Sequence, residues 1–285
     1  MIRNLILGLT LAAAAVARQA AAQSAIPTPA SVLGFPVGAD FKLATYDQSL
    51  RYFRALARSS DRIKLVDVGK TSTGGEWILA IISSPANLAR LDTLRAISQR
   101  LAHPTGLGDE EARRLAREGK PFVDISGGLH ASEIAGSQHT IQLAYDLLSR
   151  PDDPGHKAIL DHTVLLLWPS INPDGQNIVA NWYRENVGTP YEVAPLHELY
   201  QKYIGHDNNR DAYMLNVVES RVVARTWRDW EPHGSPSWRC RPSGWRSPPE
   251  LARCARGSRS TSPGLRAWTK GGPSGSLTST NSSTP

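Results

Sequence analysis

The 285-residue chain has few cysteines, and their position separates them from most metal and redox motifs. There are two, Cys240 and Cys254, both within the last 50 residues. Their spacing matches no compact metal or redox motif, so we assign them no role beyond an incidental disulfide after export. The sequence also has no G-x-S-x-G and no G-x-x-x-x-G-K-[ST] pattern. This excludes the usual serine-hydrolase elbow and the phosphate-binding loop.

Excess positive charge is absent from most of the chain, although the net charge is +6. Residues 234–285 contain seven arginines, one lysine and one acid, Glu250, so this segment carries +7 and residues 1–233 carry −1. A basic patch is the mark of a nucleic-acid partner, and none has to be explained before residue 234. We therefore expect no nucleic-acid partner.

The same C-terminal segment lacks isoleucine, valine, phenylalanine, tyrosine and methionine. Twelve serines, seven prolines and seven glycines make up half of residues 234–285. Such a composition cannot offset the entropy lost in ordering a core, yet the segment holds three tryptophans, which disordered linkers avoid. An excess of Arg, Ser, Pro, Gly and Trp is typical of a GC-rich gene translated out of register. We interpret residues 234–285 as a disordered, aberrant, frameshifted tail, and the alternative is a genuine basic tail.

Long apolar runs are also lacking, except at the N-terminus. The apolar run Leu5–Val16 follows Arg3, and three alanines precede Gln23. A bilayer span needs about 20 residues, so this run is too short to be one. The pattern predicts a signal peptide over residues 1–22 that is removed on maturation. We therefore expect an exported protein, periplasmic or secreted, without a stable membrane anchor.

Between these ends, apolar spacing predicts one α/β domain over residues 23–233, incomplete at its C-terminus. Alternation of strands and helices implies a mostly parallel mixed sheet with helices on both faces. The first two strands, joined by TSTGGE, form a hairpin. The predicted strands are Ile63–Val68, Trp77–Ile82, Pro121–Ser126 and Thr163–Asn172, and the predicted helices are Asp47–Arg58, Ala86–Leu101, Asp109–Glu118, Ser132–Ser149 and Val217–Trp230.

Polar residues follow two of these strands, at the edge of a parallel sheet where ligands bind. The third strand is followed by GGLHASE, in which His130 and Glu133 are three residues apart on the predicted first turn of a helix. That spacing places both side chains within reach of one ion. An imidazole and a carboxylate are ligands that a catalytic zinc site uses, with one position left for water. The fourth strand ends in INPDG, which predicts a type I turn.

A third polar stretch, GHDNNRD, begins at Gly205. A glycine followed by dense polar residues suits a loop that directs several donors into a crevice. Arg210 is able to hold a carboxylate through two parallel hydrogen bonds.

The stretches GGLHASE, SINPDG, NWYREN and GHDNNRD, in this order and at these intervals, resemble the zinc carboxypeptidases of the carboxypeptidase A type. The resemblance covers about Ile63 to Pro232. It implies a zinc metallocarboxypeptidase that acts on peptides with a free C-terminal carboxylate. The implied roles are zinc ligation by His130 and Glu133, oxyanion stabilisation by Arg184, binding of the substrate carboxylate by Asn209 and Arg210, and orientation of the first zinc histidine by Asp207.

The family pattern departs from this sequence at several positions. Ser132 stands where digestive members have arginine. The third zinc ligand is expected on a strand after the helix at 217–230, where His233 comes too early, and the general base is expected later still. Glu250 is the one acid there, and no strand surrounds it. Two alternatives therefore stay open: a non-catalytic remnant that binds zinc or peptide without turnover, and a zinc amidohydrolase of related fold.

Overall fold

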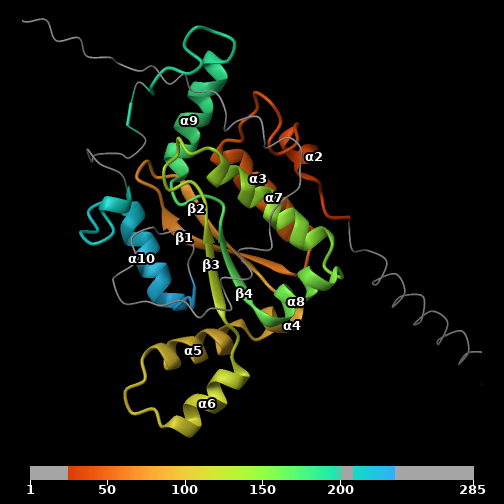
Figure 1. Ribbon diagram of the computed structural model, residues 1–285, viewed down its shortest axis with the longest axis vertical. Helices are drawn as coiled ribbons and strands as arrows, with labels where there is room; N and C mark the ends of the chain where they lie inside the picture. Colours follow the sequence, from red (N-terminus) through yellow and green to blue (C-terminus); the bar gives the residue numbers. More distant parts are fainter. Residues whose placement is uncertain (1–24, 197, 200–207, 235–285) are drawn as a thin grey trace, which may run out of the picture. The chain divides into compact units, whose positions relative to one another are not determined.

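The computed structural model describes residues 25–196, 198–199 and 208–234. In this part of the chain four strands form one mixed sheet in the order β1-β2-β4-β3, and their bounds are Ile63–Lys70 (β1), Glu76–Ile82 (β2), Phe122–Ser126 (β3) and Val164–Trp168 (β4). β2 pairs antiparallel with both β1 and β4, whereas β3 and β4 pair parallel. Consequently β1, β3 and β4 run in one direction and end at the same edge of the sheet (Figure 1).

The two central strands are apolar because both faces of the sheet are covered. All five residues of β4 are buried, and β2 is buried from Trp77 to Ile82. Strands covered on both faces read as unbroken apolar runs, which is why they were predictable. The ring centroids of Trp77 and Trp168 lie 5.6 Å apart, and the Trp77 indole donates to the Ser170 carbonyl at 2.9 Å. These contacts fix the chain that follows β4 against β2.

Helices lie on both faces, as predicted (Figure 1). On one face α3 contacts α2, α7 and α9, and on the other α10 packs against β1 and α5. The helix bounds are Pro29–Leu33 (α2), Tyr46–Ser59 (α3), Pro85–Ala89 (α4), Leu91–Ala102 (α5), Asp109–Glu118 (α6), Ala135–Ser149 (α7), Pro154–His162 (α8), Pro173–Asn186 (α9) and Val218–Trp230 (α10). The mixed α/β class with helices on both faces is confirmed.

Several element boundaries differ from those predicted. The helix expected over 86–101 is two helices, α4 and α5, because Arg90 between them leaves the helical region with φ −116° and ψ 26°. α7 begins at Ala135 and not at Ser132. The strand expected over 163–172 ends at Trp168, since Pro169 has no N–H with which to continue a ladder.

The type I turn predicted at INPDG is the first turn of a helix, α9. Asn172 is the N-cap of α9, its side chain accepts from the Gly175 N–H at 3.1 Å, and Pro173 occupies the first helical position. A type I turn and the first turn of a helix have similar dihedral angles, so the same residues suit both. α2, α8 and α9 were not predicted, and each begins with a proline after a polar cap.

After α10 the chain returns to the outer edge of β3. The His233 N–H donates to the Phe122 carbonyl and the Asp124 N–H to the Gly234 carbonyl, both at 2.8 Å, in a parallel bridge between Val123 and Gly234. His233 is therefore level with the first residue of β3. At about 3.3 Å per residue, the other end of β3 lies about 13 Å away.

The predicted signal peptide and the predicted tail from residue 235 onward lie outside the described residues. Within the described ranges, no helix is both long and apolar enough to cross a membrane.

Candidate metal centre and carboxylate-binding segment

Glycines bring the end of β3 and the start of α7 into close contact. A Cβ on Gly127 would lie 1.9 Å from the Gly136 carbonyl oxygen, so no other residue fits there without moving the backbone. Gly128 has φ +74°, a conformation that side chains disfavour. The chain is thereby free to turn sharply out of the sheet and present residues 129–133 at its edge.

His130 and Glu133 lie in that turn, one residue short of the Ile134 N-cap of α7. The Glu133 N–H donates to the His130 carbonyl at 2.9 Å, which closes the turn. The Nδ1 of His130 is 3.4 Å from the Oε1 of Glu133, and the exposed fractions of the two side chains are 21% and 69%. The two side chains thus lie next to each other, although both residues precede the helix.

The separation of the two groups suits a shared zinc ion. With metal–ligand distances near 2.1 Å, two ligands of a tetrahedral site are about 3.4 Å apart. The imidazole nitrogen and the carboxylate oxygen are also the correct donor types. However, no group of three or more His, Cys, Asp or Glu residues suited to a metal occurs among the described residues. The described residues thus offer two candidate ligands, whereas a catalytic zinc site needs three.

The turn that carries His130 is attached to the segment between β4 and α9. The Ile171 N–H donates to the Gly127 carbonyl at 3.0 Å, and the Asn172 side-chain amide donates to the Leu129 carbonyl at 3.4 Å. Asn172 therefore has two tasks, since the same side chain caps α9. Sequence reasoning missed this role, although an asparagine before a proline is a helix-start signal.

Arg184 lies in the last turn of α9. Its Nη2 donates to the Leu43 carbonyl at 2.7 Å and to the side-chain oxygen of Gln48. Burial lowers the pKa of the Arg184 guanidinium, and the like charge of Arg51 acts in the same direction. Arginine nevertheless stays charged in proteins, and in the described chain this one forms no ion pair. Both of these hydrogen bonds go to α3 or to the segment just before it, so the oxyanion role of Arg184 stays a prediction.

Asn209 and Arg210 form a short 3-10 helix, Asn208–Arg210. Arg210 is exposed, whereas Asn209 is buried and its Oδ1 has no hydrogen-bond partner among the described residues. Asp207, predicted to orient the first zinc histidine, lies outside the described residues. Asp211, the residue after Arg210, is fully buried and accepts from the backbone N–H groups of Asn216 and Val217, both at 3.0 Å. Asp211 thus ties the candidate carboxylate-binding segment, Asn208–Arg210, to the start of α10.

His233 lies beside the first residue of β3, whereas His130 follows the last, so the two histidines are at opposite ends of this strand. Its Nδ1 accepts from the Phe122 N–H at 3.1 Å, and desolvation lowers the pKa of the ring. Because β3 separates the two histidines, His233 does not complete the site. This agrees with its position in the sequence, which is too early for the third ligand.

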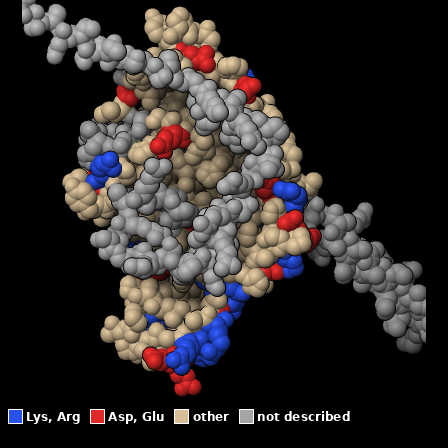
Figure 2. Space-filling view, viewed as in Figure 1, with Lys and Arg blue, Asp and Glu red and all other residues tan. Residues whose placement is uncertain are grey.

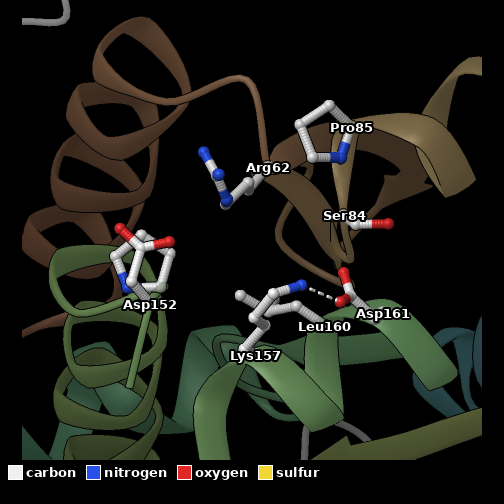
Figure 3. Close-up of a pocket in the computed structure, with 8 residues that line it drawn as sticks. Arg62, Ser84, Pro85, Asp152, Lys157, Leu160 and Asp161 are labelled. Carbon is white, nitrogen blue, oxygen red and sulfur yellow. Dashed lines mark hydrogen bonds and ion pairs between the residues drawn. The ribbon is translucent and has the colours of Figure 1, made fainter. Parts of the chain in front are cut away.

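A small pocket in the structure also lies away from the candidate site. It opens beside the start of β1 and the helices α4 and α8, and its lining includes Arg62, Ser84, Lys157 and Asp161 (Figure 3). Lys157 and Asp161, one turn apart on α8, pair with each other at its side (Figure 3). Cations and carboxylates are thus already balanced there, at the amino end of β1.

Charged side chains on the face seen in Figure 2 gather mainly at the lower end, where α6 lies. α6 has three acids in its first turn, and Arg114 pairs with Glu118 at 2.9 Å. Alternating charge of this kind is typical of a solvated helix and not of a nucleic-acid surface.

The sequence model of the zinc carboxypeptidase family matches residues 49–250, more than half of the chain. The chain therefore belongs to the zinc carboxypeptidase family. The match continues beyond His233 into the basic segment. A search of curated proteins found no match.

Similar solved structures include thrombin-activatable fibrinolysis inhibitor (14% identity, TM-score 0.47), carboxypeptidase A from Helicoverpa armigera (17%, 0.42) and a metallo-carboxypeptidase from Burkholderia cenocepacia (15%, 0.41). They are covered over 50%, 47% and 39% of their lengths, by 73%, 70% and 66% of this chain. The chain thus spans half or less of these structures. The family assignment rests on the sequence match alone.

Proposed function

We propose that this chain is part of an exported zinc metallocarboxypeptidase that removes C-terminal residues from peptides. The observation that carries the proposal is the 3.4 Å separation of His130 Nδ1 and Glu133 Oε1 at the edge of the sheet, in a chain of this family. Bound there, zinc would act as a Lewis acid on a carbonyl and lower the pKa of its water to about 7.

The protein's own groups would bind and orient the peptide. Arg210, exposed beside the buried Asn209, would hold the terminal carboxylate through parallel N–H donors. Asn209, buried beside Arg210, would donate its side-chain N–H groups to the same carboxylate. Arg184 would place positive charge where an oxyanion develops, using guanidinium N–H groups other than those of Nη2.

A second candidate is a non-catalytic remnant that binds zinc or peptide without turnover. It is favoured by the number of ligands, because the described residues supply two and His233 lies at the wrong edge. Hydrolysis of a hippuryl peptide with added zinc separates the two candidates. We expect zinc binding that is lost in His130→Ala. Turnover that disappears in this variant supports the peptidase, and binding without turnover supports the remnant.

The third candidate, a zinc amidohydrolase, differs in the substrate that it prefers. A peptidase with Arg210 in the proposed role prefers a peptide acid over the matching peptide amide and over N-acylated amino acids. Equal or faster hydrolysis of N-acylated amino acids would contradict the peptidase. Export through residues 1–22 predicts a mature protein that begins at about Gln23, which N-terminal sequencing of the exported form checks.

A further inference from the structure

The turn between β1 and β2 lies between the two halves of the candidate site. This hairpin turn, Thr71–Gly75, is at the same edge as His130 because β1 runs parallel to β3 (Figure 1). Three backbone N–H groups close it: Thr71 N–H donates to the Gly75 carbonyl (3.0 Å), Gly74 N–H to the Thr71 carbonyl (2.9 Å) and Gly75 N–H to Thr71 Oγ1 (3.0 Å). The Thr71 and Thr73 hydroxyls also hydrogen-bond to each other at 3.3 Å. The turn is therefore internally braced.

On one side the hairpin turn is held by α9. The two carboxylate oxygens of Asp174 accept from the Thr73 N–H at 2.9 Å and from the Thr73 hydroxyl at 2.7 Å. Asp174 lies two residues after Asn172, which holds the Leu129 carbonyl beside His130. This side of the turn is thus connected to the metal-binding residues.

On the other side the hairpin turn is held by α10. The carboxylate of Glu219 accepts from the Ser72 N–H at 3.1 Å and from the Ser72 hydroxyl at 2.8 Å. Glu219 is buried, and it lies two residues after Val217, whose N–H is held by Asp211. Asp211 directly follows Arg210, so this side is connected to the carboxylate-binding segment.

We propose that Ser72 and Thr73 are positioning residues that set the separation between the metal-binding pair and Arg210, acting through Asp174 and Glu219. Each of the two residues gives both its backbone N–H and its hydroxyl to one carboxylate, and charge-assisted hydrogen bonds of this kind are short and directional. A peptide acid must reach Arg210 with its carboxylate while its scissile carbonyl reaches the metal. The hairpin turn therefore decides whether one peptide can use both.

The inference rests on the proposed function, and it predicts a specific loss. When one peptide reaches both the metal and Arg210, the binding of zinc and the binding of peptide are energetically coupled. Bound zinc then tightens peptide binding by the same factor by which peptide tightens zinc binding. Removing the Thr73 hydroxyl by Thr73→Val loosens the separation without touching either binding group. Coupling falls, while zinc affinity measured alone and peptide affinity measured alone stay the same.

The experiment measures three dissociation constants by calorimetry on the full chain: zinc alone, hippuryl-phenylalanine alone, and hippuryl-phenylalanine at saturating zinc. For the unmodified chain we expect coupling of about 5-fold or more, the lower end of the usual range. In Thr73→Val and Ser72→Ala coupling falls toward 1, and each separate affinity changes by less than about 2-fold. Thr73→Ser keeps the hydroxyl and restores the coupling.

Thr163→Val is the matched control, because its hydroxyl donates to the Ile159 carbonyl at 2.6 Å at the opposite edge of the sheet. Asp174→Asn, which keeps side-chain size, is a second test of the same contact. Coupling that persists in Thr73→Val, or a parallel loss of all three affinities, overturns the positioning role. An unmodified chain without any coupling contradicts the proposed function itself, and the inference with it.

Discussion

At the scale of single residues, the placement of His130 depends on a neighbour that has no side chain. Gly127→Ala would set a Cβ 1.9 Å from the Gly136 carbonyl oxygen, which belongs to the backbone of α7. We expect a loss of at least about 3 kcal/mol in the free energy of unfolding, because overpacking against backbone cannot be relieved by rotation of a side chain. Urea unfolding followed by circular dichroism measures it.

Gly108→Ala is the control for this substitution. Gly108 has φ −77° and its added Cβ would meet nothing within 4 Å, so its effect should stay within about 0.5 kcal/mol. Equal stability of Gly127→Ala and Gly108→Ala would show that the close approach of β3 and α7 is not required.

His233 makes stability depend on pH in a defined direction. Desolvation lowers the pKa of its ring, and the Nδ1 that accepts from the Phe122 N–H must be unprotonated. A lowered folded pKa means that the unfolded chain binds the proton more readily. The contribution is therefore complete above the unfolded pKa, about 6.5, and is lost as pH falls through the folded pKa. Since the residue as a whole is exposed, we expect less than about 1 kcal/mol.

Urea unfolding between pH 7.5 and 5 tests this expectation. His233→Gln should flatten the decline of stability toward acid pH, whereas His162→Gln, at an exposed position on α8, should leave the decline unchanged. A steeper decline in His233→Gln than in the unmodified chain would mean that the sign is wrong.

At the scale of elements, the N-cap of α9 links the segment after β4 to the turn after β3 by a hydrogen bond. Asn172→Ala removes the cap of α9 and the hydrogen bond to the Leu129 carbonyl together. We expect a loss of about 1 kcal/mol in stability, the usual cost of a lost N-cap, and weaker zinc binding because the turn with His130 is released. Thermal unfolding and zinc titration measure the two effects.

Asn172→Ser separates them, because serine is also a good cap but is too short to reach Leu129 in the same way. This variant should regain most of the stability and little of the zinc affinity. If zinc affinity returns with stability, the contact to Leu129 has no role in holding the site.

The elements themselves were largely predictable, and the reasons are local. β2 and β4 were recognisable as strands because all their residues except Glu76 are apolar, and the glycine turn before His130 was visible because glycine has few other uses there. α9 was missed because its first turn has turn-like residues. The hydrogen bonds that hold the hairpin turn to α9 and α10 could not be predicted, since Thr73 and Asp174 are 101 positions apart and Ser72 and Glu219 are 147 apart. Only folding brings those polar residues together.

At the scale of the whole molecule, the features of the site fall into a present half and a missing half. The family match, His130, Glu133 and the carboxylate-binding segment belong to the present half. The described residues offer no third ligand, and the basic charge of the chain begins only at residue 234. We propose that the reading frame changes near residue 233 and that the missing ligand and base are encoded in the other frame.

The last prediction follows from the change in composition after His233. His233 and Gly234 already pair in parallel with β3, so a frame-restored chain would continue along β3 toward His130 and bring a third ligand to the metal. Zinc affinity should then rise by more than about 100-fold over the present chain, since even changes outside the ligand shell alter it 10- to 100-fold. The control is the present chain ended at residue 234, whose net charge falls from +6 to −1 and whose zinc affinity should not change. If the downstream frame encodes no histidine, or if restoring it leaves zinc affinity unchanged, the chain's two ligands are all that its site has, and the remnant is the correct description.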